Sequence, residues 1–227
     1  MGTVMQLEQI LNKRKSCRAF LDRPVETHLL RTIIAKAARA PSNGNLQPWQ
    51  IYIVTGTALA SLKQTTKKLV DDQVPLQTAE YEVYPKPLKD AYNKRRQEIG
   101  EDLYRVLGIP REDKQKRRNQ FAKNALMFNA PAAVFAYIDR SLSYGQWMDL
   151  GMYLQSLMLL CEGHGLATCA QGYWTFFHET VRQTTAAPDD LMLACGIAIG
   201  FEDQDAPINK VQSSRVAVED FAVFIDR

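Results

Sequence analysis

A short basic segment near the start of the chain has the residue types that bind a phosphate group. Arg14, Ser16 and Arg18 are two residues apart, and Lys15 lies between them. In an extended segment, side chains with this spacing share one face. Guanidinium groups match the oxygens of a phosphate monoester, and such charge-assisted hydrogen bonds are stronger than neutral ones. An alternative stays open here, because basic residues also complement the negative end of a helix dipole.

A second segment, residues 40–49, has the residue types that bind the edge of a polar ring. Four of its side chains carry a hydroxyl or an amide: Ser42, Asn43, Asn45 and Gln47. Amides both donate and accept hydrogen bonds, as the pyrimidine edge of a flavin requires. Pro41 and Pro48 stiffen the segment, although an ordinary turn has a similar composition. Together, the two segments indicate the two ends of a flavin mononucleotide (FMN) site.

The hydrophobic pattern predicts the elements that position these segments. Apolar residues three and four apart predict a short helix around residues 7–11 and an amphipathic helix over residues 26–39, which ends before Pro41. Short apolar runs predict strands. We expect strands at 50–55, 132–138 and 191–201, a short strand or turn at 167–172, a short helix at 177–185 and a final strand at 216–225.

Residues 148–161 are apolar on nearly every side of the predicted helix. A helix without a polar face is buried in a core or against another subunit. This segment therefore predicts an oligomer.

The middle of the chain, residues 81–123, is strongly charged and has no continuous apolar face. We favour a solvated pair of helices, because charge runs are usually solvated faces. The alternative is a mobile lid over the active site. Such a lid would bring four tyrosines near a substrate: Tyr81, Tyr84, Tyr92 and Tyr104.

Composition argues against several classes of protein. A formal net charge of +3, without basic runs that alternate with aromatic residues, argues against nucleic-acid binding. No apolar run reaches the roughly 18 residues of a membrane span, and residues 1–10 do not have the pattern of a signal peptide. The four cysteines show no C-x-x-C pair, which favours reduced thiols and the cytoplasm. The three histidines have no ligand-like spacing, so we expect no metal site.

The chain resembles the nitroreductase family of FMN-dependent NAD(P)H oxidoreductases. The resemblance implies an α+β fold with a mixed sheet flanked by helices, a single domain over residues 1–227 with a helical insertion at about 81–123, and an interlocked homodimer. Four motifs carry it along nearly the whole chain: Arg-x-Ser-x-Arg at 14–18, Ala-Pro-Ser-x-x-Asn-x-Gln-Pro-Trp at 40–49, the apolar helix before Gly-His-Gly-Leu-Ala-Thr at 163–168, and Arg215.

The resemblance also implies roles for individual residues. The phosphate and ribityl chain of FMN would be held by Arg14, Lys15, Ser16, Arg18 and Arg215 of one subunit. The flavin ring would be approached by Pro41, Ser42, Asn43, Asn45 and Gln47 of the other subunit, and its N5 atom by Ala170, Gln171 and Gly172. The sequence departs from some relatives at Ser213, where they carry a second cation. As substrate contacts we predict Trp49, Tyr92 and Trp174, although aromatic residues are more often part of a core.

The implied reaction is a ping-pong transfer, in which NADH or NADPH passes a hydride to the flavin and an electron-poor acceptor then takes the electrons. The acceptors would be nitroaromatic compounds, including nitrobenzoates, or similar molecules. The cofactor performs the chemistry, so no side chain is predicted as an acid or base. The alternative is a flavin-binding protein of the same fold with a role in sensing, flavin breakdown or reductive dehalogenation.

Overall fold

The computed structural model describes residues 2–226, with side chains from residue 7 onward. The helices are α1 (Gly2–Lys13), α2 (Thr27–Ala37), α3 (Gly56–Asp71), α4 (Asp90–Val106), α5 (Lys114–Ala122), α6 (Tyr144–Gly163) and α7 (His178–Thr185). The strands are β1 (Gln50–Thr55), β2 (Ala132–Asp139), β3 (Ala167–Gln171) and β4 (Leu191–Gly200). Short 3₁₀ turns lie at η1 (Asn43–Asn45), η2 (Lys123–Asn129), η3 (Gly172–Phe177), η4 (Pro207–Lys210) and η5 (Val218–Asp220). Nearly every predicted helix and strand is present.

The four strands form one sheet in the order β1-β2-β4-β3, and every neighbouring pair is antiparallel. The predicted α+β class is therefore confirmed, but the expectation of a mixed sheet needs correction. Within residues 2–226, parallel pairing is confined to an isolated bridge between Ser16 and Thr168. This bridge places the predicted phosphate-binding segment along the outer edge of β3.

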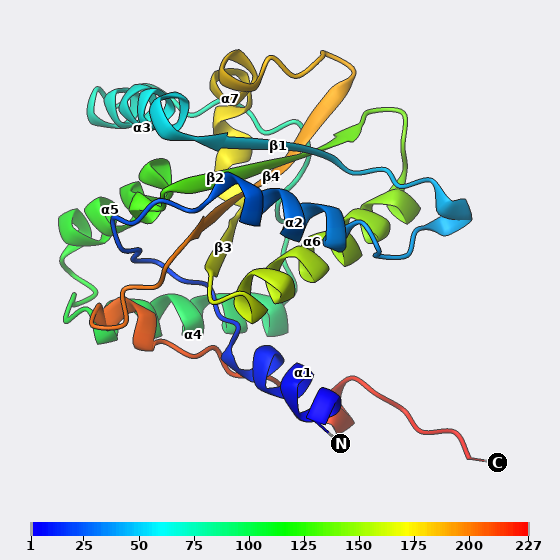
Figure 1. The fold of residues 1–227 in the computed structure, drawn as a ribbon. Coiled ribbons are helices and arrows are strands. Elements are labelled where there is room, and N and C mark those ends of the chain that lie inside the picture. Colours follow the sequence, from blue (N-terminus) through cyan, green and yellow to red (C-terminus); the bar gives the residue numbers. More distant parts are fainter. Residues whose placement is uncertain (1, 227) are drawn as a thin grey trace.

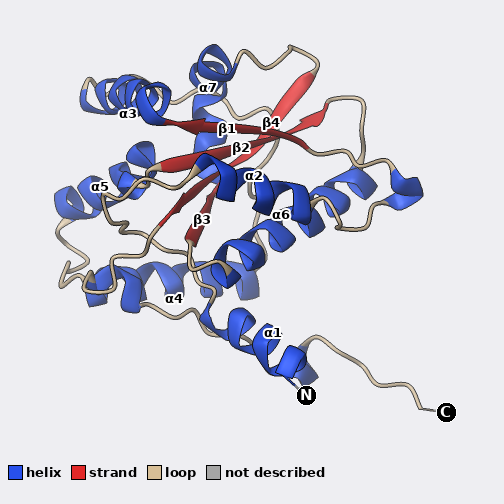
Figure 2. Cartoon of the chain, viewed as in Figure 1, coloured by secondary structure: helices blue, strands red, loops and turns tan. Residues whose placement is uncertain are grey.

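Helices and turns cover both faces of the sheet (Figure 2). Successive residues of a strand point to opposite faces, and β2 shows this alternation. Val134 packs with α2 and α6, whereas Phe135 packs on the other side with α3, η2 and η3. The sheet is therefore buried on both sides and forms a rigid platform for the loops at its edges.

Helix α6 begins at a capping box formed by Ser143 and Gln146, in which side chain and backbone satisfy each other's end groups. The predicted apolar helix is confirmed, but its own chain covers only one face. The opposite face exposes apolar side chains, with Tyr144 at 88% and Met148 at 69% of their full accessible areas. The large apolar area that remains open is typical of an interaction surface.

The predicted strand at residues 216–225 is wrong. Within the described chain this tail contains only the short turn η5 and is otherwise irregular. Val223, Phe224 and Ile225 are almost fully exposed. The apolar pattern indicated a strand, but no strand of the described chain lies beside the tail to supply ladder hydrogen bonds.

Residues 81–123 contain α4 and α5, and neither helix has a buried residue. This agrees with the favoured interpretation of a solvated helix pair. Movement of the segment as a lid remains a prediction.

Candidate functional site

A cavity of 260 Å³ lies between the end of α1 and the C-terminal tail. These parts of the chain are far apart in sequence but lie side by side at the lower end of the molecule (Figure 1). The cavity is lined by Leu11, Asn12, Arg14, Lys15, Gln212, Ser213 and Arg215. The structure therefore brings together Arg14, Lys15 and Arg215, as the family resemblance implied.

The charge of this cavity is positive and largely uncompensated. Lys15 pairs with Glu202, with 2.8 Å between Nζ and Oε1. Among the described residues, neither Arg14 nor Arg215 forms an ion pair. Arg215 Nη1 donates to the Ser213 carbonyl and hydroxyl oxygens at 3.0 and 2.7 Å, which constrains the local conformation of the tail. This donor set of guanidinium, hydroxyl and amide groups fits a phosphate.

Ser16 and Arg18 do not line this cavity. Ser16 bridges to Thr168 of β3, and Arg18 Nη1 donates to the Ser16 carbonyl oxygen at 3.1 Å. The Arg18 amide donates to Asn209 Oδ1 at 2.7 Å, and Asn209 is a buried residue that sequence reasoning missed. A single sequence does not reveal such a role, because Asn209 binds only backbone groups, which every residue has.

The thiol of Cys169 lies beside Ser16 and Arg18. Burial raises the pKa of this thiol to about 11, although the Arg18 charge and a hydrogen bond with Ser16 oppose the shift. The other three thiols are likewise buried or half-buried, and burial raises the pKa of each to about 12: Cys17, Cys161 and Cys195. All four cysteines are unpaired and protonated at neutral pH, so they are poor nucleophiles.

The predicted ring-binding loop, residues 41–48, points its polar side chains outward. Gly44, Asn45 and Gln47 have left-handed backbone conformations, with φ of 58°, 57° and 49°. Ser42 Oγ accepts the Gln47 amide at 3.0 Å, which closes the loop on itself. Asn43, Asn45 and Gln47 have exposed side chains, and Ser42 is half-buried. These groups are therefore available to a ligand.

The two predicted halves of the site lie at opposite ends of α6. The loop meets the first part of this helix, where the Asn43 amide donates to Asp149. Helix α1, which leads into Arg14, meets the last residue of α6, since a Cβ on Gly163 would lie 3.3 Å from Ile10. Asp149 and Gly163 are 14 residues apart, about 21 Å along the helix axis at 1.5 Å per residue.

Strand β3 leads into η3, where the sequence predicted contact with the flavin N5 atom. Ala170 is exposed, whereas the Gln171 side chain is buried and donates to the Asn124 carbonyl and amide oxygens at 3.1 Å. Only backbone groups of Gln171 are therefore available to a ligand. Trp174 is 0% exposed and packs edge-to-face on Phe135. Its predicted role as a substrate contact is wrong, because its ring belongs to the core.

The other two predicted substrate contacts have accessible rings. Trp49 is half-buried and stacks on Tyr153. Tyr92 is exposed on α4. A third aromatic residue, Tyr84, is 54% exposed, and its neighbour Val83 lies 3.3 Å from the position of a Cβ on Gly172. The segment that contains Val83 and Tyr84 therefore passes close to the start of η3.

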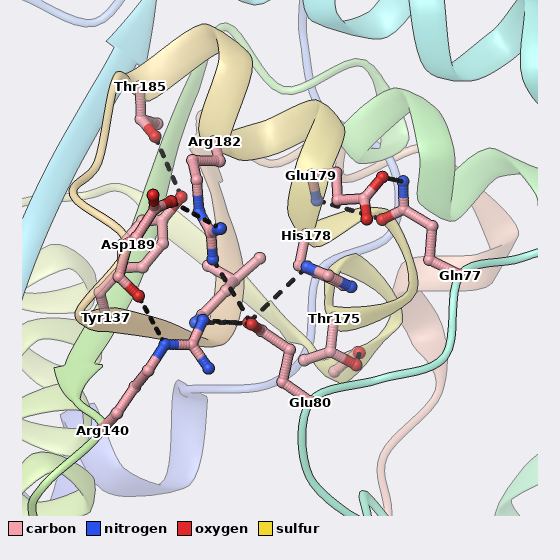
Figure 3. Close-up of polar contacts among 12 residues, drawn as sticks. Gln77, Glu80, Tyr137, Arg140, Thr175, His178, Glu179, Arg182, Thr185 and Asp189 are labelled. Atoms are coloured by element: carbon pink, nitrogen blue, oxygen red, sulfur yellow. Dashed lines mark hydrogen bonds and ion pairs between the residues drawn. The ribbon is translucent and has the colours of Figure 1, made fainter.

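A charged cluster fixes the start of the 81–123 segment (Figure 3). Glu80 accepts from Arg140 and also lies 3.4 Å from Arg182 Nη2. Its second oxygen accepts the Leu193 amide at 3.4 Å and lies 3.7 Å from His178 Nδ1. Burial opposes ionisation of Glu80, but the hydrogen bond from Arg140, together with the nearby His178 and the Arg140 charge, outweighs burial and lowers the pKa of this carboxyl.

The next residue, Tyr81, also fixes the start of this segment. The Tyr81 hydroxyl donates to the Ala194 carbonyl oxygen, and its ring packs on Trp147 with centroids 4.8 Å apart. The residues that follow therefore leave the sheet at a fixed point, next to η3. Sequence reasoning missed Glu80, because its four partners come from three distant parts of the chain.

Comparison with known proteins identifies the family. The model of the nitroreductase family matches residues 11–201. The chain therefore belongs to the nitroreductase family. It is 32% identical over 225 residues to nitrobenzene nitroreductase of Ectopseudomonas oleovorans, and the match covers 99% of both chains. It is also 32% identical over 221 residues to 4-nitrobenzoate reductase of Nocardioides sp., with 96% of this chain and 89% of the relative covered.

Solved structures agree with this assignment. The crystal structure of the FMN- and NADPH-dependent nitroreductase NfnB from Sphigopyxis sp. strain HMH superposes with a TM-score of 0.93 at 40% identity, over 97% of this chain and 99% of that chain. The FMN-dependent nitroreductase NfnB from Mycobacterium smegmatis, in complex with NADPH, superposes with a TM-score of 0.92 at 26% identity, over 98% and 99% of the two chains. The fold is thus that of FMN-dependent nitroreductases.

Two kinds of feature are absent from the described residues. None of their helices is both long enough and apolar enough to cross a membrane. In the same part of the chain, histidine, cysteine and carboxylate side chains form no group of three that could hold a metal ion.

Proposed function

We propose that this protein is an FMN-dependent NAD(P)H oxidoreductase that reduces nitroaromatic acceptors. The observation that supports this most directly is the cavity in which Arg14 and Arg215 converge without a carboxylate partner among the described residues. Two unpaired guanidinium groups that face one space attract an anion and can bind it through charge-assisted hydrogen bonds. The phosphate of FMN is the anion that the family resemblance supplies.

When bound, FMN accepts a hydride from NADH or NADPH and passes electrons to the acceptor. The residues of this chain bind and orient the reactants. Arg14 and Arg215 hold the phosphate, and Lys15, which is paired with Glu202, lines the same cavity. The amide side chains of residues 41–48 bind the ring edge, and the backbone of residues 170–172 lies along the reactive side. No side chain is required as an acid or base.

The working unit is a homodimer with a site shared between subunits. One chain holds the cationic cavity and the amide loop near opposite ends of α6, where the contact residues Gly163 and Asp149 are about 21 Å apart along the helix axis. A second copy brings its own loop to the cavity of the first. The exposed apolar residues of α6 and of the tail supply the surface for this contact. The four unpaired thiols are consistent with work in the cytoplasm.

The acceptor binds on the side of η3 from which Val83 and Tyr84 approach, and α4 and α5 cover it as a lid. These helices carry basic residues, including Arg95, Arg96 and Arg118, that favour an acceptor with a carboxylate. A relative named 4-nitrobenzoate reductase fits this preference. Equal turnover of neutral nitrobenzene and 4-nitrobenzoate would argue against it.

Rapid mixing tests the proposal. The protein loaded with FMN is mixed with NADPH or NADH, and the flavin absorbance near 450 nm is followed as it bleaches. Addition of 4-nitrobenzoate without oxygen then restores the absorbance if the protein is a nitroreductase. Binding of FMN without bleaching would instead support the alternative of a flavin-binding protein with a sensing role. Protein that stays colourless after FMN is added would overturn both.

A further inference from the structure

Asp149 carries a carboxylate in a place where ionised groups are rarely found. The residue is 3% exposed and lies in α6 next to the core residue Leu150. Burial of an ionised carboxylate is unfavourable unless hydrogen bonds or a cation compensate. In the described part of the chain no cation pairs with Asp149, and its partner is the backbone amide of Asn43, 3.1 Å from each oxygen.

The remaining hydrogen bonds of the loop stay within it. The Asn45 amide donates to the Ser42 carbonyl oxygen at 2.9 Å, and the Leu46 amide donates to the Asn43 carbonyl oxygen at 3.2 Å. Left-handed conformations at Asn45 and Gln47 are unfavourable for residues with a Cβ. For residues 41–48, the contact with Asp149 is thus the hydrogen bond that ties this strained loop to the rest of the described chain.

A second contact from the same helix face holds the other end of the loop. Tyr153 lies four residues after Asp149, and side chains with this spacing share one face of a helix. Its ring stacks on Trp49, with centroids 4.9 Å apart and planes inclined by 21°. Helix α6 therefore contacts the loop at Asn43 and at Trp49. The polar side chains of Asn45 and Gln47 between them are exposed.

We infer that Asp149 is a positioning residue for the flavin ring, an inference that rests on the proposed function. By accepting the Asn43 amide, the carboxylate sets the direction in which the side chains of Asn43 and Asn45 leave the loop. Its charge has a second effect. A negative charge without a neighbouring cation disfavours the addition of electrons to a ring bound over the loop. Asp149 thus strengthens FMN binding and lowers the midpoint potential of the bound flavin.

Two substitutions separate these effects. Asp149→Asn keeps an oxygen that accepts the Asn43 amide but removes the charge, whereas Asp149→Ala removes both. Asp139→Ala is the matched control, because the Asp139 carboxylate also accepts a backbone amide, that of Ser141 at 2.8 Å. The readouts are the dissociation constant of FMN from the apoprotein, the midpoint potential of the bound flavin, and the thermal unfolding curve.

For Asp149→Ala we expect FMN to bind about tenfold more weakly, as loss of a charge-assisted hydrogen bond predicts. For Asp149→Asn we expect nearly unchanged affinity and a more positive midpoint potential. Asp139→Ala should change neither. A folded Asp149→Ala protein with wild-type affinity, or an Asp149→Asn protein with an unchanged potential, would overturn the inference. If Asp149→Ala does not fold, the potential of Asp149→Asn decides alone. Wild-type protein that fails to bind FMN would instead overturn the proposed function, and this inference with it.

Discussion

Asp149 and Glu80 are two little-exposed carboxylates that each fix the start of a functional loop, but their partners differ. Asp149 accepts one backbone amide and has no cationic partner among the described residues. Glu80 faces Arg140, Arg182 and His178, and also accepts a backbone amide. The first therefore depends on one geometric contact, and the second on a network of charges.

Because their partners differ, loss of Glu80 and loss of Asp149 should affect different properties of the protein. A network of charges contributes to the stability of the fold and depends on pH, because both partners must stay ionised. A single hydrogen bond to a backbone amide mainly sets the direction of a loop. Loss of Glu80 should therefore appear in unfolding experiments, and loss of Asp149 in properties of the bound flavin.

The largest expected effect on stability follows from Glu80→Gln. This change removes the charge that Arg140 and Arg182 face, so the free energy of unfolding should fall by about 2 kcal/mol, the order contributed by a hydrogen bond to a charged group. Urea denaturation monitored by circular dichroism measures it. Glu82→Gln is the control, since Glu82 is exposed and forms no ion pair with described residues. Equal unfolding midpoints for Glu80→Gln and Glu82→Gln would show that the charges around Glu80 do not stabilise the fold.

Acid should reduce this contribution. The pKa of Glu80 in the folded protein is lowered from its ordinary value of 4.5, so the ionised carboxylate stabilises the fold above that value. The stabilisation is lost as the pH falls through the lower folded value. The difference in unfolding free energy between wild type and Glu80→Gln should therefore be constant near neutral pH and shrink as the pH falls below about 4.5. A difference that grows towards acid would show that the sign is wrong.

A smaller effect is expected from the second contact of the Asp149 loop. Trp49→Leu keeps an apolar side chain but removes the stack on Tyr153, which should lower the unfolding free energy by about 1 kcal/mol. FMN affinity should fall less than in Asp149→Ala, because the Asn43 amide remains bound. If Trp49→Leu weakened FMN binding more than Asp149→Ala, the stack on Tyr153 would matter more for the loop than the hydrogen bond to Asp149.

Much of the architecture could be predicted from the sequence. The predicted strands at 132–138 and 191–201 correspond to β2 and β4, because their apolar runs are buried on both faces of the sheet. The tail could not be assigned, because a strand needs a partner and the pattern of residues 216–225 does not contain one. Trp174 was misassigned because an aromatic residue close to a site looks the same in sequence whether it faces the ligand or the core.

The cationic residues of the candidate site could be predicted from the sequence, because a cluster of arginines indicates an anion site. Arg14 and Arg215 converge from opposite ends of the chain, as the family resemblance implied. The anchors of the site were not predictable, because Asp149 and Asn209 bind backbone groups that any sequence provides. Only the folded chain shows which amide each of them reaches.

The measurement that tests the central claim most directly is the FMN content of a mixed dimer. One subunit carries Arg14→Gln and Arg215→Gln, and the other carries Asn43→Leu and Asn45→Leu. Each variant alone should bind no FMN. In the mixed dimer, the intact arginines of one subunit meet the intact loop of the other, so one of the two sites should regain FMN. A mixed dimer that binds no FMN, or parent dimers that bind it fully, would contradict a site shared between two copies.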